Sequence, residues 1–464
     1  MLSRTTRTLK PALRRFHSSQ ATNGEFTVTS SHGFLPRHDP LAVLPSYFDK
    51  LSELLHEMPL YKGDGTYGLL HSGRFGSRIE TELPLYDVNF IFDRRILSAL
   101  FRDYTFLASA YLLEPCDIQF RLARNHGLAR RILPMNIARP LEVIAQRIGA
   151  RPFLEHSMSY TFYNYRRKDP EQALVAENLE PIRMFSGSSS EHSYIIAHVL
   201  AGQHTGQIVQ AAQDILKAVE TDNRALFDQA LAQYTGAMQK VNNVMAETLK
   251  SSGEYMSFRT YLSGCKDSAM FNHGVQFENA HDTSQRAYFG VAQSSNPVAS
   301  LSTHLFQLAH LSPNSSLPCS DGIDRHRPAS YQAFLSHVDQ ESQRLNVQRY
   351  ALGSAKSSAS YMGALDQVLA YRYRQWANLR EAGDVQGAAA FRDGFKRQTN
   401  HVRELAGLIL RSLANTDVEL LEPQQRANTE HIAHRADVVR RSLNRVLAEP
   451  EAAAEQLPVS MIAY

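Results

Sequence analysis

The sequence predicts a mainly α-helical protein, with a small N-terminal helical cap domain over a larger helical bundle. Three stretches carry this prediction, because their apolar residues recur at steps of three and four and so fall on one face of a helix. These stretches are residues 96–112, 227–249 and 357–379. A chain of 464 residues, 43% of them hydrophobic, can bury a sizeable core as one large or two smaller domains.

Between these stretches, Gly, Pro and helix-capping residues predict where helices end and loops begin. Gly and Pro interrupt residues 25–90, so we expect loops and short helices there. A helix is expected from about residue 194 to Val219, with a break at Thr221 and with Asp222 as the N-cap of the next helix. Residues 265–330 are rich in Gly, Ser, Asn, Pro and Asp and predict long loops joined to short helices, which often carry function.

Further helical patterns cover about residues 385–412 and 425–447. We therefore expect four segments along the chain. They are a mitochondrial transit peptide at 1–24, a small N-terminal domain at 25–130, a large helical domain at 131–380 and a C-terminal helical extension at 381–464.

The N-terminal 24 residues differ in composition from the rest of the chain. They contain five basic residues and no acid, and they are rich in Ser and Thr, which is typical of a peptide that directs a protein to the mitochondrial matrix. The alternative is a disordered basic tail on a cytoplasmic protein. Since the formal net charge of the whole chain is +3, the remainder carries −2. A slightly acidic body without a basic, aromatic-interleaved stretch argues against nucleic-acid binding.

Several other classes of site are disfavoured by the sequence. The three cysteines lie far apart and form no CxxC pair, which suits a reducing compartment and argues against a thiolate zinc site. Apolar stretches fall short of the roughly 20 residues that cross a bilayer, so no membrane span is expected. Walker, GxGxxG, HExxH and GxSxG patterns do not occur, so common nucleotide-binding and hydrolase mechanisms have no support.

Among the 19 histidines, only His431 and His434 have the spacing that two metal ligands need on one helix. They lie in a strongly charged segment without nearby acidic or cysteine ligands, which favours a solvated helix face over a metal site. Arg259 lies among apolar and aromatic neighbours and can grip a carboxylate through two hydrogen bonds, or else form a structural ion pair. The run at 288–297 lets the backbone approach a flat ligand closely, but it is equally an ordinary turn.

Five runs, read in order, resemble the indoleamine 2,3-dioxygenase family. They are ILPMNIARPLEVIAQRIGARPFLEHSMSYTFYNYRRKDPEQ at 132–172, MFSGSSSEHSYIIAHV at 184–199, FRTYLSGCK at 258–266, GVAQSS at 290–295 and AYRYRQW at 370–376. The resemblance covers about residues 40–380. It implies a haem-dioxygenase-like fold in which a small domain covers a helical domain that holds haem b (iron). It further implies an oxidoreductase that uses dioxygen to open the pyrrole ring of L-tryptophan or a related small-molecule indole.

The resemblance also implies roles for individual residues. Arg259 matches the arginine that pairs with the substrate carboxylate, and Phe258, Tyr255 and Tyr194 match positions in the pocket wall. Gly290, Val291 and Ala292 match a small-residue loop over the haem, which continues through Ser294. Arg372 matches an arginine near a haem propionate.

Four positions depart from the family pattern. Gln375 stands where the family carries its iron-ligating histidine, and an amide oxygen donates far less to ferrous haem than imidazole does. His198 stands where many members have a small hydroxyl residue. Leu301 replaces the acid that accompanies the proximal arginine, and Glu254 replaces a substrate-side phenylalanine.

Three accounts of these departures remain open. In the first, haem binds and the iron takes another axial ligand, with His198 the best-placed candidate and His304, His310 or His401 less so. The reaction then belongs to an oxidative enzyme, which could serve a biosynthetic pathway and need not open tryptophan. In the second, the iron is lost and a ligand-binding or regulatory protein remains. In the third, the match is misplaced, although no histidine occurs between His337 and His401.

Overall fold

The computed structural model of the chain describes residues 24–248, 256–266, 268–272, 274–278, 285–291, 296–311, 324–381 and 389–448. Two groups of predictions lie outside these residues. They are the targeting segment 1–24, except its last residue, and the site residues Glu254, Tyr255, Ala292 and Ser294. The described part is mainly α-helical, as the sequence predicted.

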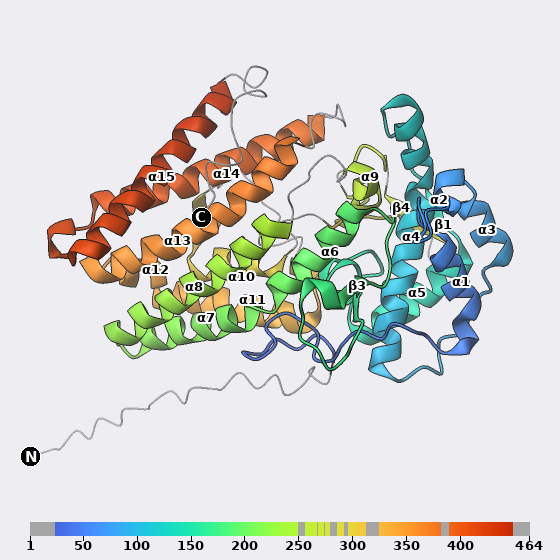
Figure 1. Cartoon of the computed structure of the whole chain (residues 1–464), viewed down its shortest axis with the longest axis horizontal. Helices are drawn as coiled ribbons and strands as arrows, with labels where there is room; N and C mark the ends of the chain where they lie inside the picture. The colour runs from blue at the N-terminus through green and yellow to red at the C-terminus, as the bar shows by residue number, and fades with distance from the viewer. Residues whose placement is uncertain are drawn as a thin grey trace, which may run out of the picture.

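The first part of the chain forms one end of the molecule (Figure 1). Its elements are the short turn η1 (Ser46–Phe48), α1 (Asp49–Glu57), α2 (Leu69–Ser72), α3 (Phe75–Glu82), the long α4 (Arg94–Ala123), β1 (Ile132–Leu133) and α5 (Met135–Ile148).

The middle of the chain begins with a π-helical turn and ends in a buried helix. Its elements are the π-helical turn η2 (His156–Tyr160), β2 (Tyr165–Arg167), η3 (Ala176–Asn178), β3 (Leu179–Pro181), α6 (Ser189–Gly202), α7 (Thr205–Glu220), α8 (Arg224–Thr248), α9 (Met256–Arg259), η4 (Thr260–Leu262), β4 (Val275–Phe277), β5 (Gln285–Arg286) and α10 (Pro297–Leu305).

The last part of the chain ends in long helices that lie at the opposite end of Figure 1, beside α7 and α8. Its elements are η6 (Leu308–Leu311), η7 (Asp324–His326), α11 (Ala329–Leu345), α12 (Val347–Ala351), α13 (Ala355–Glu381), α14 (Ala389–Ala414), η8 (Val418–Leu420) and α15 (Pro423–Ala448). Helices α13, α14 and α15 lie side by side, and α8 packs on α13.

Helix α4 is the central core helix of the first part of the chain, and it contains the helix predicted from the apolar spacing at residues 96–112. Asp93 caps its first turn by accepting hydrogen bonds from the backbone N–H groups of Arg95 (2.7 Å) and Ile96 (3.2 Å). By length and composition, it is the one helix of the described chain that could cross a membrane. However, 94% of its apolar window is buried inside the protein, so its apolar side chains are accounted for by packing.

The helix expected from about 194 to Val219 is in fact two helices, α6 and α7. They separate because the Thr205 hydroxyl donates to the Gly202 carbonyl (2.6 Å) and accepts from the backbone N–H of Phe34 (3.0 Å), which ties the N-terminal segment into the junction. The expected N-cap, Asp222, is also wrong. Asn223 performs this role, since its side chain accepts from Leu226 N (3.0 Å), while Asp222 takes a positive φ of 49°.

Residues 265–330 contain more regular structure than the composition predicted. Strand β4 pairs with β1 in parallel and with β5 antiparallel, so this region completes a small sheet that begins with β1 at Ile132. Helix α10 is buried along its whole length, with Asn296 as its N-cap and Pro297 at its first turn. A second small sheet, β2 with β3, is antiparallel.

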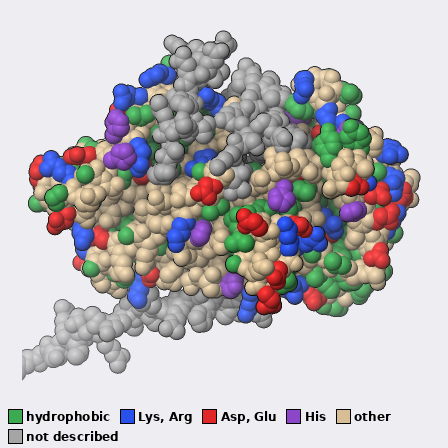
Figure 2. Space-filling view, in the orientation of Figure 1, with side chains coloured by type: hydrophobic (Ala, Val, Ile, Leu, Met, Phe, Trp, Pro, Cys, Tyr) green, Lys and Arg blue, Asp and Glu red, His purple; other side chains and the backbone are tan. Residues whose placement is uncertain are grey.

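The exposed surface mixes charges of both signs. On the face shown in Figure 2, Lys and Arg side chains are interspersed with Asp and Glu rather than gathered along a groove. The histidine pair of α15, His431 and His434, is exposed, as a solvated helix face requires.

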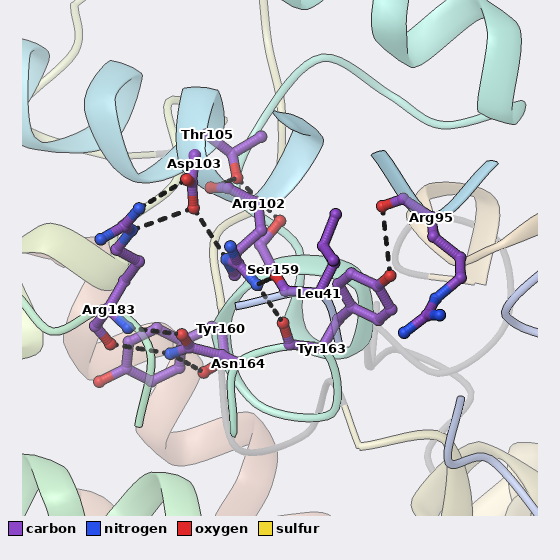
Figure 3. Close-up of polar contacts among 10 residues, drawn as sticks. All are labelled: Leu41, Arg95, Arg102, Asp103, Thr105, Ser159, Tyr160, Tyr163, Asn164 and Arg183. Carbon is purple, nitrogen blue, oxygen red and sulfur yellow. Dashed lines mark hydrogen bonds and ion pairs between the residues drawn. The ribbon is translucent and has the colours of Figure 1, made fainter. Parts of the chain in front are cut away.

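A buried ionic cluster fastens α4 to the segments around it (Figure 3). Asp103 accepts from Arg102 Nε (2.8 Å) and from Arg183 Nη2 (2.8 Å), and the Asp103 and Arg102 side chains are both fully buried. Arg102 also donates to the carbonyls of Leu41 (2.9 Å) and Tyr163 (3.3 Å). Burial alone raises the pKa of Asp103, but the two arginines hold it below its usual value. Through this pair of residues, α4 is therefore joined to three other stretches of chain, at Leu41, Tyr163 and Arg183.

Replacing Asp103 with asparagine should leave two buried cations without their counter-charge. We expect the free energy of unfolding to fall by about 3–5 kcal/mol, measured by urea denaturation followed by circular dichroism. The control is Glu180→Gln, which removes the partner of the more exposed Arg166 and should cost less than about 1 kcal/mol. Equal losses of unfolding free energy in the two variants would contradict the role of Asp103 as the counter-charge of the two buried arginines.

Candidate functional site

A small pocket, partly open to solvent, lies between helices α6, α8 and α13. It is lined by His198 of α6, by Met245 of α8 and by four residues of α13, namely Tyr371, Arg374, Gln375 and Asn378. The four positions on α13 follow helical spacing, so a single face of that helix turns towards the pocket. The structure thus brings together Gln375 and His198, two of the departures singled out from the sequence.

The His198 side chain is held in one tautomer. Its Nδ1 lies 2.8 Å from the carbonyl oxygen of Tyr194, one helical turn earlier. Because a carbonyl can only accept, Nδ1 carries the proton and Nε2 keeps a lone pair. Burial lowers the pKa of His198 to about 4, so the imidazole is neutral at physiological pH. The pocket wall therefore contains a neutral nitrogen donor.

The Gln375 side chain is hydrogen-bonded to a residue of its own helix, Arg372. Its Oε1 accepts from Nη1 of Arg372 at 3.4 Å, and Arg372 is anchored on α10 by donating to Ala299 O (3.1 Å) and Thr303 Oγ1 (3.0 Å). Leu301, predicted to replace an acid near this arginine, is buried in the same helix α10. Arg372 thus links the pocket helix to α10 through neutral acceptors.

Aromatic side chains surround His198 on the side of α9. The Tyr194 ring lies with its centroid 4.4 Å from that of His198 and 5.7 Å from that of Phe258. Phe258 is fully buried and also stacks near Tyr160, with centroids 6.5 Å apart. Two residues predicted as pocket walls, Phe258 and Tyr194, therefore lie together beside the predicted nitrogen ligand.

The start of the GVAQSS run is fastened to the segment that follows Arg259. Val291 N donates to Leu262 O at 2.8 Å, and Lys266 N donates to Tyr288 O at 2.9 Å. The backbones approach so closely that a Cβ on Gly290 would lie 2.2 Å from both Leu262 O and Gly264 N. Glycine is required at this position by the close approach of two backbones.

Arg259 lies at the end of α9, next to Phe258, and is not among the residues that line this pocket. Its charge acts on His126. Burial first, and then the nearby Arg259, lower the pKa of that histidine, whose Nδ1 is 3.4 Å from Thr260 Oγ1. Arg259 is therefore not a pocket-lining residue, whereas its neighbour Phe258 belongs to the aromatic cluster beside His198.

The other histidines considered as iron ligands have different surroundings. His304 is an ion-pair centre between Asp324 (3.1 Å) and Asp339 (3.0 Å); burial opposes its charge, but the two acids raise its pKa to about 9, so it is not a neutral donor. His401 on α14 is buried, with its pKa lowered to about 3 by burial and by Arg372, but it does not line the pocket. The side chain of His310 lies outside the described structure.

Sequence reasoning missed one residue of this region, His156. Its ring lies edge-on against that of His198, with centroids 5.1 Å apart. It lies inside the run 132–172 that carries much of the resemblance, so its residue type was visible, but its contact with His198 was not. Across the described residues, no group of three or more His, Cys, Asp or Glu side chains could hold a metal ion.

Comparisons with known proteins agree with the resemblance. A family model described as Indoleamine 2,3-dioxygenase matches residues 22–376. Indoleamine 2,3-dioxygenase 2 of Homo sapiens is 22% identical over 319 residues, 68% of this chain and 72% of the relative. Indoleamine 2,3-dioxygenase 1 of Rattus norvegicus is 20% identical over 318 residues (68% and 73%), and Indoleamine 2,3-dioxygenase of Saccharomyces cerevisiae is 22% identical over 357 residues (72% and 73%).

Replacing Gly290 with alanine should separate the two fastened segments, because neither backbone atom at 2.2 Å can move without breaking the pairing. We expect a loss of about 1–3 kcal/mol in the free energy of unfolding, measured by urea denaturation. Gly236→Ala on α8 is the matched control. Nothing lies within 4 Å of its Cβ position, and alanine in a helix should stabilise by about 0.5–1 kcal/mol. If Gly290→Ala left the free energy of unfolding unchanged, the close approach of the two backbones would not require glycine at this position.

Proposed function

Because the chain belongs to the indoleamine 2,3-dioxygenase family, we propose that it is a haem-dependent, dioxygenase-like oxidoreductase acting on L-tryptophan or a related indole or amino-acid-derived metabolite. The observation that supports this most directly is the neutral, tautomer-fixed imidazole of His198 in a pocket beside an aromatic cluster. Family membership supports the oxidoreductase class. The departures at Gln375 and His198 concern which residue would bind the iron and which reaction the protein would catalyse.

The donor chemistry of the pocket fits haem iron on one side. His198 offers an Nε2 lone pair while its other ring nitrogen donates to a backbone carbonyl, which is the usual arrangement of a metal-bound histidine. On the opposite side, Gln375 offers only an amide oxygen, already an acceptor for Arg372. His198, rather than Gln375, would therefore hold the iron. Haem b, when bound, supplies the iron that binds and activates dioxygen.

The remaining residues of the site would bind and orient the substrate. Arg259 would pair with a substrate carboxylate, as its match to the family indicates, and Phe258 and Tyr194 would stack on a flat aromatic ring. Gly290 and Val291 would let the backbone lie close to that ring, since they have little or no side chain to hold it away. Full burial of Phe258 excludes water from this wall.

A second candidate function rests on Gln375. An amide at this position, engaged by Arg372, suits a homologue that has lost the iron and retains the pocket as a ligand-binding or regulatory site. The two functions differ in one measurable property, which is the retention of haem.

The first test is the absorption spectrum of protein expressed with a haem precursor. We expect a Soret band that survives dialysis and that shifts or weakens in His198→Ala, because the iron loses its imidazole ligand. Gln375→His should change the band in another way, by placing a second imidazole on the α13 side. His431→Ala, which removes an exposed histidine of α15, is the control and should leave the spectrum unchanged.

Two outcomes of this experiment would contradict the proposal. Absence of a Soret band at any haem loading would exclude the haem enzyme and leave the ligand-binding function. A band that is the same in wild type and in His198→Ala would keep the haem but exclude His198 as its ligand.

The second test concerns Arg259. Arg259→Leu should weaken binding of L-tryptophan about 10- to 100-fold, since a hydrogen-bonded ion pair contributes about 1.5–3 kcal/mol. Tryptamine, which lacks the carboxylate, should bind wild type and variant alike in isothermal titration calorimetry. Arg440→Leu on the exposed face of α15 is the control and should change neither affinity. Unchanged tryptophan affinity in Arg259→Leu would assign Arg259 to a structural ion pair.

A further inference from the structure

The pocket wall contains one side chain with a permanent charge, that of Arg374 on α13. The other lining residues are uncharged at neutral pH, namely His198, Met245, Tyr371, Gln375 and Asn378. Burial lowers the pKa of the His198 imidazole to about 4 and raises that of the Tyr371 phenol to about 12. Because the pocket is partly open to solvent, a small group can reach this wall from outside.

The guanidinium of Arg374 is oriented by a buried amide of the neighbouring helix α8. Asn242 is fully buried, and its Nδ2 donates to both the backbone carbonyl and the Oε1 of Gln367, each at 3.0 Å. With its amino group engaged in this way, Asn242 presents Oδ1 to Arg374, whose Nη1 donates to it at 3.2 Å. A neutral amide orients the guanidinium without cancelling its charge. Arg374 is therefore positioned in the pocket wall as a cation.

The two arginines that the family match assigns to carboxylates are both absent from the pocket lining. Arg259 lies at the end of α9. Arg372 is on α13, but its Nη2 donates to Ala299 O and Thr303 Oγ1 of α10. A carboxylate that enters the pocket would therefore meet Arg374 rather than either of these residues. Guanidinium groups bind carboxylates well, because two of their N–H donors can face the two oxygens in parallel.

We propose that Arg374 binds a carboxylate group of the ligand that occupies this pocket. The inference rests on the proposed function for the two sources of such a group, a propionate of haem b and the carboxylate of an amino-acid-derived substrate. Both sources present the same planar anion with two acceptor oxygens. Arg374 would thus fix the orientation of the ligand, whereas His198 would hold the iron.

The first arm of the test measures haem binding to the apoprotein by titration of the Soret absorbance. Haem b carries propionates, and its dimethyl ester carries none. If Arg374 binds a propionate, Arg374→Gln should weaken binding of haem b about 10- to 100-fold, because a hydrogen-bonded ion pair is lost. The ester should bind wild type and variant alike. Arg374→Lys, which keeps the charge but not the parallel donors, should give an intermediate loss.

The second arm compares L-tryptophan with tryptamine, which lacks the carboxylate, by isothermal titration calorimetry. If Arg374 binds the substrate carboxylate, Arg374→Gln should weaken tryptophan binding about 10- to 100-fold and should not weaken tryptamine binding.

The matched control for both arms is Arg380→Gln, the same substitution on the same helix at a residue that does not line the pocket. The Arg380 guanidinium lies over the Trp376 ring, 5.6 Å from its centroid. This variant should change none of the four affinities. Circular dichroism should show the same helical content in wild type and in all three variants.

The two arms identify the source of the carboxylate. A loss of affinity confined to haem b assigns the propionate, and a loss confined to tryptophan assigns the substrate carboxylate. If Arg374→Gln and Arg374→Lys both bind haem b and tryptophan as tightly as wild type does, the inference is wrong and the proposed function stands. If wild type binds neither haem b nor tryptophan, the proposed function and this inference both fail.

Discussion

The arrangement of the site depends on one buried carboxylate, that of Asp103. A buried charge is tolerated only when opposite charges and hydrogen bonds surround it, and here Arg102 and Arg183 do so. Arg102 reaches the carbonyl of Tyr163, which lies just after the π-helical turn, and Arg183 precedes the first residue of α6 by a few positions. Helix α4 thus positions both the turn that carries His156 and the helix that carries His198.

Helix α13 keeps its place without an iron–histidine bond. Arg372 joins it to α10 through the Ala299 carbonyl and the Thr303 hydroxyl, and the Trp376 indole N–H joins it to Thr399 of α14 at 2.8 Å. Since these bonds fasten α13 to two neighbouring helices, an imidazole at position 375 is not needed to hold the frame. The fold and the chemistry of the pocket can therefore change separately, which explains how family membership coexists with Gln375.

The sequence predicted the long helices well and the site only in part. Helices α4, α8 and α13 were predictable because apolar residues recur along them at helical spacing, a property that the sequence alone reveals. The close approach of Gly290 to Gly264 involves backbones 26 residues apart, and the partners of His156 and His198 come from different elements. Such contacts are set by tertiary packing, so residue types suggested candidates but could not show that Arg259 is absent from the pocket lining.

Helices α14 and α15 lie beyond the part of the chain that the family model matches, yet they are joined to the pocket helix. Arg435 of α15 pairs with the buried Asp366 of α13, and Trp376 is covered by α14. The pocket residues of α13 lie on another face of the same helix, and the extension contributes no pocket-lining residue among those described. The C-terminal helices thus contact the back of α13, the element that carries Gln375, rather than the site itself.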